Sequence, residues 1–206
     1  MRYAKQLGLR VPRALLTNDP QAAARFFEEC QGEVIYKPLS QGVPRPQIGE
    51  PWQGAVYTTK LSRSALQEHL STIAFTTTFF QEYISKAFEL RINVIGSHVF
   101  AAEIHSQHSE RAKVDLRLGY EDLHYGIHTL PASIEEACCQ LVTLFDLQFS
   151  AIDMLVTPAG EYVFLELDSN GQWGWIEHHT GLPLTETLVN LLARGQIEEC
   201  AKDRGE

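Results

Sequence analysis

The chain has 206 residues, which is long enough for one large domain or two small lobes. Hydrophobic residues make up 44% and charged residues 21%, as in folded globular proteins and unlike disordered ones. The formal net charge of −9 argues against nonspecific binding to nucleic acid or anionic membranes, which requires clustered Lys and Arg. The start, MRYAKQLGLRVPRALL, lacks the features of a signal peptide, and no apolar run approaches the roughly 20 residues of a membrane span. We therefore expect a cytoplasmic protein that binds neither nucleic acid nor membrane.

The first third of the chain alternates helix and strand signals. Asn18 or Asp19, followed by Pro20, predicts the start of a helix that runs to about residue 30, because Asn and Asp cap free backbone amides and Pro suits the first helical position. A short strand is expected over 33–37, and it opens into a segment, 38–54, that is rich in proline and glycine and predicts a mobile loop. A further strand over 55–61 and a Ser62-capped helix over 62–74 are then expected.

Antiparallel strands dominate the remainder. The pair Gly96-Ser97 and the run 157–160 are hairpin turn signals, and residues 105–130 are polar without periodicity, so an irregular segment is expected there. Ser133 with Glu136 three residues on predicts a capping box. The strands are expected over 79–84, 89–96, 98–106, 150–157 and 161–167, and the helices over 133–147 and 184–195. Because hairpins outnumber βαβ crossovers, we expect an α+β fold with antiparallel sheets.

Three acids in apolar strand segments are the strongest candidates for chemistry: Asp153, Glu166 and Asp168. If the hairpin turns near 157–160, Asp153 lies opposite Glu166 and all three acids share one face. Crowded carboxylates repel one another, and a divalent cation would offset that repulsion. Three are too few for an all-protein cage, which suits Mg²⁺ completed by water and phosphates. From these residues alone, a solvent-facing side of the sheet is an equally good interpretation.

Two other positions carry charges that phosphate or sugar groups could use. Lys37 ends a strand at the Gly/Pro-rich loop and could contact phosphate, although no Walker or dinucleotide motif is present and a surface lysine is the simpler interpretation. Glu89 and Arg91 share a strand face. They form either a simple ion pair or a functional pair, in which Glu89 accepts hydrogen bonds from sugar hydroxyls and Arg91 neutralises phosphate oxygens.

Several segments, taken in order, resemble the ATP-grasp superfamily over nearly the whole chain. The nearest resemblance is to the peptide maturases that make graspetides, the microviridin-type macrocycles, which are themselves similar to RimK-like glutamate ligases. The last of the matching segments is the most specific to the maturase branch. The segments are GLRVPRALLTNDP, EVIYKPL, FFQEYI, FELRINVIG, SAIDMLV and LELDSNGQWGWIEHHTGLPL.

The resemblance implies an ATP-grasp fold in which two α+β lobes with antiparallel sheets sandwich ATP. Residues 1–84 would form the small lobe with the phosphate loop and adenine hinge, and residues 85–206 the large lobe with the metal site. Family members carry a further N-terminal domain, and this chain is expected to begin at the segment that joins it to the first lobe, as a truncated or minimal member.

The resemblance also implies a role for individual residues. Lys37 contacts ATP phosphates, and Glu89 holds the ribose. An arginine of the irregular segment, Arg117 or in its place Arg111, faces the transferring phosphoryl group. The adenine hinge is Gln81, Glu82, Tyr83 and Ile84, and the ligands of Mg²⁺ (or Mn²⁺) are Asp153, Glu166 and Asp168. At the last of these positions the family more often has Asn.

The implied reaction is that of an ATP-dependent ligase. A carboxylate attacks the γ-phosphate to give an acyl phosphate, and a hydroxyl or amine then displaces phosphate. The specific prediction is macrocyclisation of a ribosomal precursor peptide that carries carboxylates and Ser, Thr or Lys, and the family analogy also admits a homodimer. Two alternatives stay open: a RimK-like ligase that adds glutamate to a protein tail, and an inactive nucleotide- or peptide-binding module.

Overall fold

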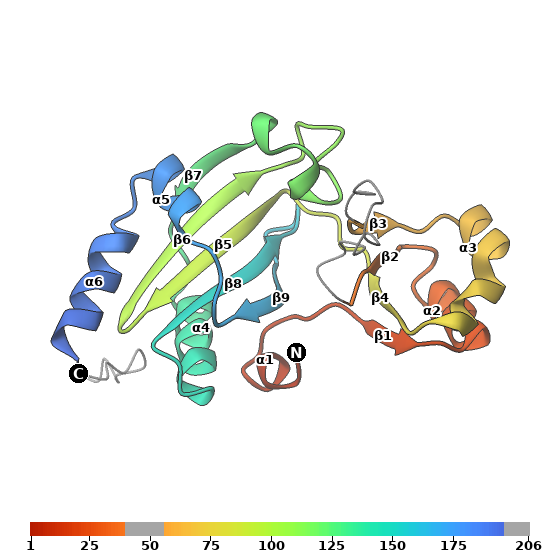
Figure 1. The fold of residues 1–206 in the computed structure, drawn as a ribbon, viewed down its shortest axis with the longest axis horizontal. Helices are drawn as coiled ribbons and strands as arrows, with labels where there is room; N and C mark the ends of the chain where they lie inside the picture. The colour runs from red at the N-terminus through yellow and green to blue at the C-terminus, as the bar shows by residue number, and fades with distance from the viewer. Residues whose placement is uncertain (40–55, 196–206) are drawn as a thin grey trace, which may run out of the picture. The chain divides into compact units, whose positions relative to one another are not determined.

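The computed structural model describes residues 1–39 and 56–195, so the predicted loop over 38–54 lies almost wholly outside the described residues (Figure 1). The chain forms two compact units. Unit 1 combines Met1–Val11, Ser85–His108 and the chain from Leu123 on, and unit 2 combines Pro12–Ile84 with Ser109–Asp122. The boundary after Ile84 coincides with the expected lobe boundary. Residues 1–11, however, belong to unit 1 and not with the rest of 1–84, and residues 109–122 belong to unit 2 and not with the rest of 85–206. The assignment of the lobes to phosphate, adenine and metal binding stays a prediction.

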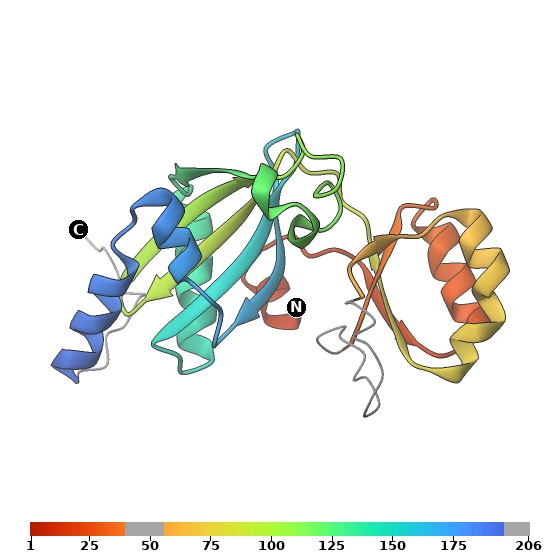
Figure 2. The same ribbon diagram turned by 45° about the horizontal axis from the view of Figure 1, so that its top comes forward.

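Unit 2 is a four-stranded antiparallel sheet with helices packed on it (Figure 2). Asp19 accepts a hydrogen bond from the Gln21 N–H at 2.8 Å, so of the two candidate caps Asp19 is the one used. Ser62 accepts one from the Ala65 N–H at 3.1 Å, which confirms the predicted cap of the next helix. Phe26, Phe27 and Phe80 join the core between helices and sheet. The sheet order is β1 (Ala14–Thr17), β4 (Thr78–Glu82), β2 (Val34–Lys37) and β3 (Thr59–Lys60), and the helices are α2 (Pro20–Glu29), α3 (Arg63–His69) and the 3-10 helix η1 (Leu70–Phe75).

Unit 1 is a five-stranded antiparallel sheet with helices on both faces. Helices α1 and α4 contribute to the main apolar core on one face, while α5 contacts β7 and α6 contacts β5 (Figure 1). The sheet order is β7 (His124–His128), β6 (His98–His105), β5 (Phe88–Ile95), β8 (Phe149–Val156) and β9 (Tyr162–Asp168). The helices are α1 (Arg2–Gln6), α4 (Ala132–Leu144), α5 (Gly174–Thr180) and α6 (Leu184–Arg194).

The central strand β5 separates the core from the candidate site. Side chains alternate across a strand, so Leu90, Ile92 and Val94 face the core that α4 completes. Glu89 and Arg91 therefore lie on the opposite face. The same alternation in β8 and β9 brings the predicted acids to that opposite face.

The prediction of irregular structure over 105–130 is wrong for β7. His124–His128 pairs with β6, in a register that places Tyr125 opposite Ile104 and Ile127 opposite Ala102. Tyr125 and Ile127 alternate within His-Tyr-Gly-Ile-His, but the segment has only 5 residues and a central Gly, so pairing with the edge of β6 is what makes it a strand. Between β6 and β7, residues 106–123 are irregular apart from two 3-10 turns, Leu116–Leu118 and Tyr120–Asp122.

The predicted capping box is also wrong. Helix α4 begins at Ala132 after Pro131, and no side chain caps it, so Ser133 lies inside the first turn. Glu136 instead accepts a hydrogen bond from Gln140 one turn on, at 2.9 Å. The predicted strand over 55–61 is confined to Thr59–Lys60, while α1 and β1 were not predicted at all. Within residues 1–39 and 56–195, no helix is long and apolar enough to span a membrane.

A polar network lies on the core side of the unit 1 sheet. The Glu103 carboxylate is within 2.8 Å of His105 Nε2 and within 2.6 Å of His128 Nδ1, and His128 Nε2 is 2.8 Å from the Tyr162 hydroxyl. Burial by itself would raise the pKa of Glu103, but the hydrogen bonds and charges of the two histidines outweigh burial and lower it. The network therefore stabilises the ionised carboxylate in the folded chain.

We predict that Glu103→Gln lowers stability near neutral pH and that the difference from the wild type shrinks in acid. A carboxyl pKa depressed in the folded state contributes stability above its ordinary value of 4.5, and this contribution is lost as pH falls through the folded pKa. Urea unfolding of both proteins between pH 3 and pH 8 measures the difference, expected at about 1–3 kcal/mol near pH 7. A difference that is the same at every pH would contradict the prediction.

Candidate functional site

The three predicted acids meet on one face of the β8–β9 hairpin. Asp153 pairs with Glu166, and Asp168 pairs with Ala151, so the predicted pairing of the acids is confirmed. A bulge follows Asp153: Asp153 pairs with Glu166 of β9, but the next residue, Met154, pairs with Phe164, so one residue of β9 is skipped. Bulges of this kind re-aim side chains and are common beside functional sites. Asp153 is half-buried, while Glu166 and Asp168 are exposed.

Arg91 ties this face together. Its Nη1 donates to Asp153 Oδ1 at 2.7 Å, and its Nη2 donates to the Gln172 carbonyl at 3.0 Å. The guanidinium also lies 5.9 Å from the centre of the Trp175 ring, in the range of a cation–π contact. One side chain of β5 thus holds an acid of β8 and the segment that follows β9.

The Asn-Gly turn after β9 is shaped by close packing. A Cβ built at Gly171 would lie 2.4 Å from the Cβ of Ala151, which is closer than side chains tolerate, so only glycine fits here. Asp168 Oδ1 accepts a hydrogen bond from the Asn170 N–H at 2.8 Å, which fixes the start of the turn.

The tryptophans of this segment lie at the start of α5. Trp175 Nε1 donates to the Gln172 carbonyl at 3.2 Å, and its ring meets that of Tyr125 edge-on at 5.8 Å. His179, one turn on in α5, stacks on Tyr125 at 4.2 Å. Trp173 stands at the N-cap position of the same helix.

Glu89, the predicted ribose ligand, lies in a buried ionic cluster. Its carboxylate is 2.6 Å from Lys86 Nζ and accepts from the Ser106 hydroxyl at 2.8 Å on both oxygens. The side chains of Lys86 and Glu89 are 7% and 8% exposed, so each neutralises the other in a site largely withdrawn from water. Sequence reasoning missed Lys86, although a cation three residues before a candidate acid was a usable signal.

The predicted hinge, Gln81–Ile84, continues β4 in unit 2. The Glu82 N–H donates to the Arg13 carbonyl and the Tyr83 N–H to the Glu33 carbonyl, each at 2.9 Å. The Glu82 carboxylate also pairs with the Arg13 guanidinium at 3.2 Å. Gln81 is buried, and its Nε2 has no hydrogen-bond partner in the described chain.

Arg117 is held in a fixed orientation by a residue that the sequence reasoning missed. Its Nε and Nη2 donate to the two oxygens of the buried Asp115 at 2.8 and 2.5 Å, and the Thr58 N–H donates to Asp115 Oδ2 at 2.9 Å. Burial would raise the pKa of Asp115, but the bonds from Arg117 and Thr58 prevail and lower it. The bidentate pair fixes the Arg117 guanidinium, whose side chain is 45% exposed. Arg111, the alternative, is exposed.

The predicted residues divide between the units. Unit 1 carries Glu89, Arg91, Asp153, Glu166 and Asp168, and unit 2 carries Lys37 at the end of β2, the hinge and Arg117. Over residues 1–39 and 56–195, no three His, Cys, Asp or Glu side chains converge closely enough to hold a metal ion as they stand. In this conformation Asp153 pairs with Arg91, and Asp168 accepts a hydrogen bond from the Asn170 N–H.

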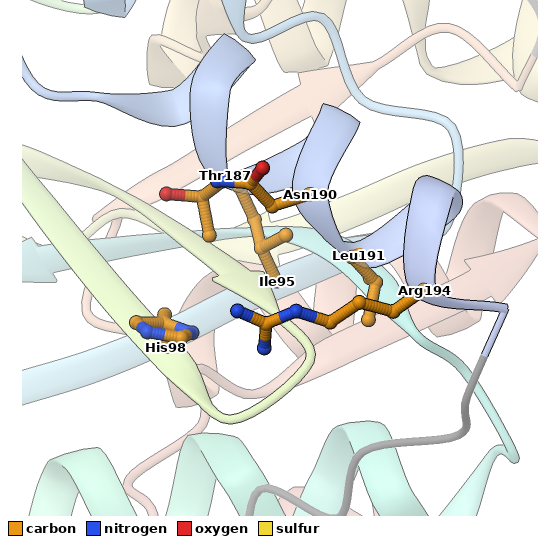
Figure 3. Close-up of a pocket in the computed structure, with 6 residues that line it drawn as sticks. All are labelled: Ile95, His98, Thr187, Asn190, Leu191 and Arg194. Atoms are coloured by element: carbon orange, nitrogen blue, oxygen red, sulfur yellow. The ribbon is translucent and has the colours of Figure 1, made fainter.

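A separate pocket of about 90 Å³ lies at the far end of β5, between the β5–β6 hairpin and α6. Figure 3 shows the guanidinium of Arg194 and the ring of His98 at its mouth, with Thr187 and Asn190 beside them on α6. Ile95 and Leu191 complete the lining. None of the predicted site residues lines this pocket.

The chain is similar to solved ATP-grasp peptide ligases. The macrocyclase MdnC from Microcystis aeruginosa MRC, bound with precursor peptide MdnA, is 32% identical, with a TM-score of 0.81 over 95% of this chain and 60% of that chain. An ATP-grasp ligase from Chryseobacterium gregarium, in complex with ADP and a leader and core peptide, is 30% identical, with a TM-score of 0.86 over 96% and 59%. The D-Ala:D-Ser ligase VanG from Enterococcus faecalis shares the fold, at 21% identity and a TM-score of 0.61.

These similarities confirm the predicted α+β, ATP-grasp fold and the resemblance to the ATP-grasp superfamily. The chain spans about 60% of the length of the first two of these proteins. A scan of protein-family models and a search of curated proteins returned no match.

We predict that Gly171→Ala destabilises unit 1, because the added methyl group collides with Ala151 and must displace the turn that Arg91 holds. The matched control is Gly174→Ala, since a Cβ at Gly174 meets nothing within 4 Å. Thermal unfolding of both variants should show a loss of about 1–3 kcal/mol for Gly171→Ala alone. Equal melting temperatures for the two variants would refute the close-packing argument.

Proposed function

We propose that this chain is the catalytic part of an ATP- and Mg²⁺-dependent ligase that joins a carboxylate to an alcohol or amine through an acyl phosphate. The observation that carries the proposal is the face of the β8–β9 hairpin, where Asp153 lies opposite Glu166, Asp168 follows on the same side and Arg91 reaches Asp153. The fold similarity to ATP-grasp peptide ligases supports the same chemistry.

The donor set fits a hard cation. Asp153, Glu166 and Asp168 offer only oxygen atoms, which Mg²⁺ and Mn²⁺ prefer, and Mg²⁺ usually needs one or two protein carboxylates beside water and phosphate oxygens. Binding would require Asp153 to share its carboxylate between Arg91 and the ion. When bound, the metal would neutralise phosphate charge.

Cationic side chains of the protein would neutralise the negative charge of the ATP phosphates. A carboxylate that attacks a γ-phosphate brings two negative groups together, so positive groups fixed in place beforehand lower the barrier. We assign this task to Lys37, Arg91 and Arg117. Asp115 would act as a positioning residue for Arg117, because its bidentate contact already orients the guanidinium.

The nucleoside would be recognised by the hinge and by Glu89. Since the N–H groups of Glu82 and Tyr83 already donate within unit 2, we propose that the Glu82 carbonyl and the Ile84 N–H read the adenine edge. The unpaired Nε2 of the buried Gln81 supports a polar ligand at this segment. Glu89 would accept hydrogen bonds from the ribose while Lys86 balances its charge.

The specific reaction that we propose is macrocyclisation of a precursor peptide by ω-ester or ω-amide bonds. MdnC and the Chryseobacterium ligase, the similar proteins with identities of 32% and 30%, were both solved with precursor, leader or core peptides. Addition of glutamate to a protein tail is the alternative reaction. Mass spectrometry separates the two, because each ring closure removes one water and each glutamate adds one residue mass.

We predict that Glu166→Gln weakens binding of Mg·ATP on the order of 100-fold, because one charged oxygen ligand is lost. Asp168→Asn is the matched control and should bind Mg·ATP at least as well as the wild type, since Asn keeps an oxygen for both the metal and the Asn170 N–H. Isothermal titration with Mg·ATP, and with ATP in EDTA as a blank, measures both. Unchanged Mg·ATP affinity in Glu166→Gln would sink the metal assignment.

A further inference from the structure

Three buried polar atoms on β5 have no hydrogen-bond partner among residues 1–39 and 56–195. Asn93 is 0% exposed, and in the described chain neither its Nδ2 nor its Oδ1 makes a hydrogen bond. The Nε of Arg91 is likewise buried without a partner. Arg91 and Asn93 are two residues apart on the strand, so both side chains lie on the same face, and their Cα atoms are about 7 Å apart.

A buried asparagine at this position lowers the stability of the fold unless its side chain is hydrogen-bonded. Buried polar groups in folded proteins are almost always hydrogen-bonded to protein or to ordered water. Ile95, two residues on and on the same face as Asn93, is apolar and 1% exposed, so an apolar side chain is compatible with this face of the strand. The buried amide therefore points to a partner other than the described residues.

Each of the two residues has one small cross-strand neighbour. Arg91 pairs with Ala102 of β6 and Asp153 of β8, and Asn93 pairs with Ala151 of β8 and Phe100 of β6. Gly171 packs directly over Ala151, where even one more methyl group would not fit. Ala102, Ala151 and Gly171 carry no polar side-chain group, so they offer no hydrogen bond to the side chains of Arg91 and Asn93.

The chemistry of the three atoms selects the partner. Arg91 Nε and Asn93 Nδ2 are donors, and Asn93 Oδ1 is an acceptor. Water accepts two hydrogen bonds and donates to the third atom. An ammonium group would be repelled by Arg91, and a carboxylate would leave Oδ1 facing another oxygen. Because Asn93 is fully buried, a peptide side chain does not reach it in this conformation.

We propose that Arg91 Nε and the Asn93 side chain bind one buried water molecule, and that Asn93 through this water is a positioning residue for Arg91. The guanidinium would then be held on three sides, by Asp153, by the Gln172 carbonyl and by the water. The water site stands on the structure alone. Its catalytic consequence rests on the proposed function, because Asp153 is the assigned metal ligand that Arg91 contacts.

Nuclear magnetic resonance on the wild-type chain tests the water directly. We expect cross-peaks between a long-lived water and both the Arg91 Nε–H and the Asn93 Nδ2–H₂ protons, and no such peaks at Arg91 in Asn93→Leu. Absence of these cross-peaks in the wild type would overturn the proposal. This measurement needs neither ATP nor a peptide, so its failure is separate from a failure of the ligase assignment.

Thermal stability gives a second test with opposite signs for the two cases. If the water is bound, Asn93→Leu removes its ligand and strands Arg91 Nε, and the Tm falls by about 2–4 °C or more. If nothing is bound, leucine replaces two unsatisfied atoms with apolar ones, and the Tm rises, which would refute the proposal. Asn93→Ser, which keeps a donor and an acceptor, should retain the water peak at Arg91 and most of the stability.

Discussion

The contact between Arg91 and Asp153 is the interaction on which the candidate site depends. Asp153 lies directly opposite Glu166, and two carboxylates in that arrangement repel one another. Arg91, 2.7 Å from Asp153 and 12% exposed, supplies the opposite charge from the neighbouring strand. The same guanidinium binds the Gln172 carbonyl. Arg91 therefore both neutralises the acids and holds the segment of the Asn-Gly turn in place. A partly buried ion pair of this kind is costly to break by removal of one partner, because the other charge is left without compensation.

The division of labour within the unit 1 sheet follows from the period of a strand. Every second residue of β5 belongs to the apolar core that α4 covers. The alternate residues Glu89, Arg91 and Asn93 lie on the other face. A rigid, packed sheet thus fixes the positions of the charged groups with little freedom. Such rigidity is what charge stabilisation requires, because groups that are already in place need not reorganise during the reaction.

The polar groups of the candidate site are each supported by a second residue. Lys86 and Ser106 hold Glu89, Asp115 holds Arg117, and Arg13 holds Glu82. Charged side chains that are fixed by partners lose little conformational freedom on binding a ligand.

Features with a local physical cause could be predicted from the sequence. Asp19 and Ser62 cap their helices through hydrogen bonds to amides two or three residues away, and the turn at 157–160 sets the register that pairs Asp153 with Glu166. A local rule also misled at Ser133, which lies inside the first turn of α4 because the helix begins at Ala132, after Pro131.

Only the tertiary structure decided the rest, because the causes lie between residues far apart in the chain. Strand β7 forms because β6 offers it an edge, since a segment of 5 residues with a central glycine is a weak strand by itself. Gly171 must be glycine because Ala151, twenty positions earlier, occupies the space of a side chain. The sequence determined that three acids and an arginine would share the strands of one sheet, and the fold decided that Arg91 would neutralise Asp153, since an ion pair across strands depends on the register of both.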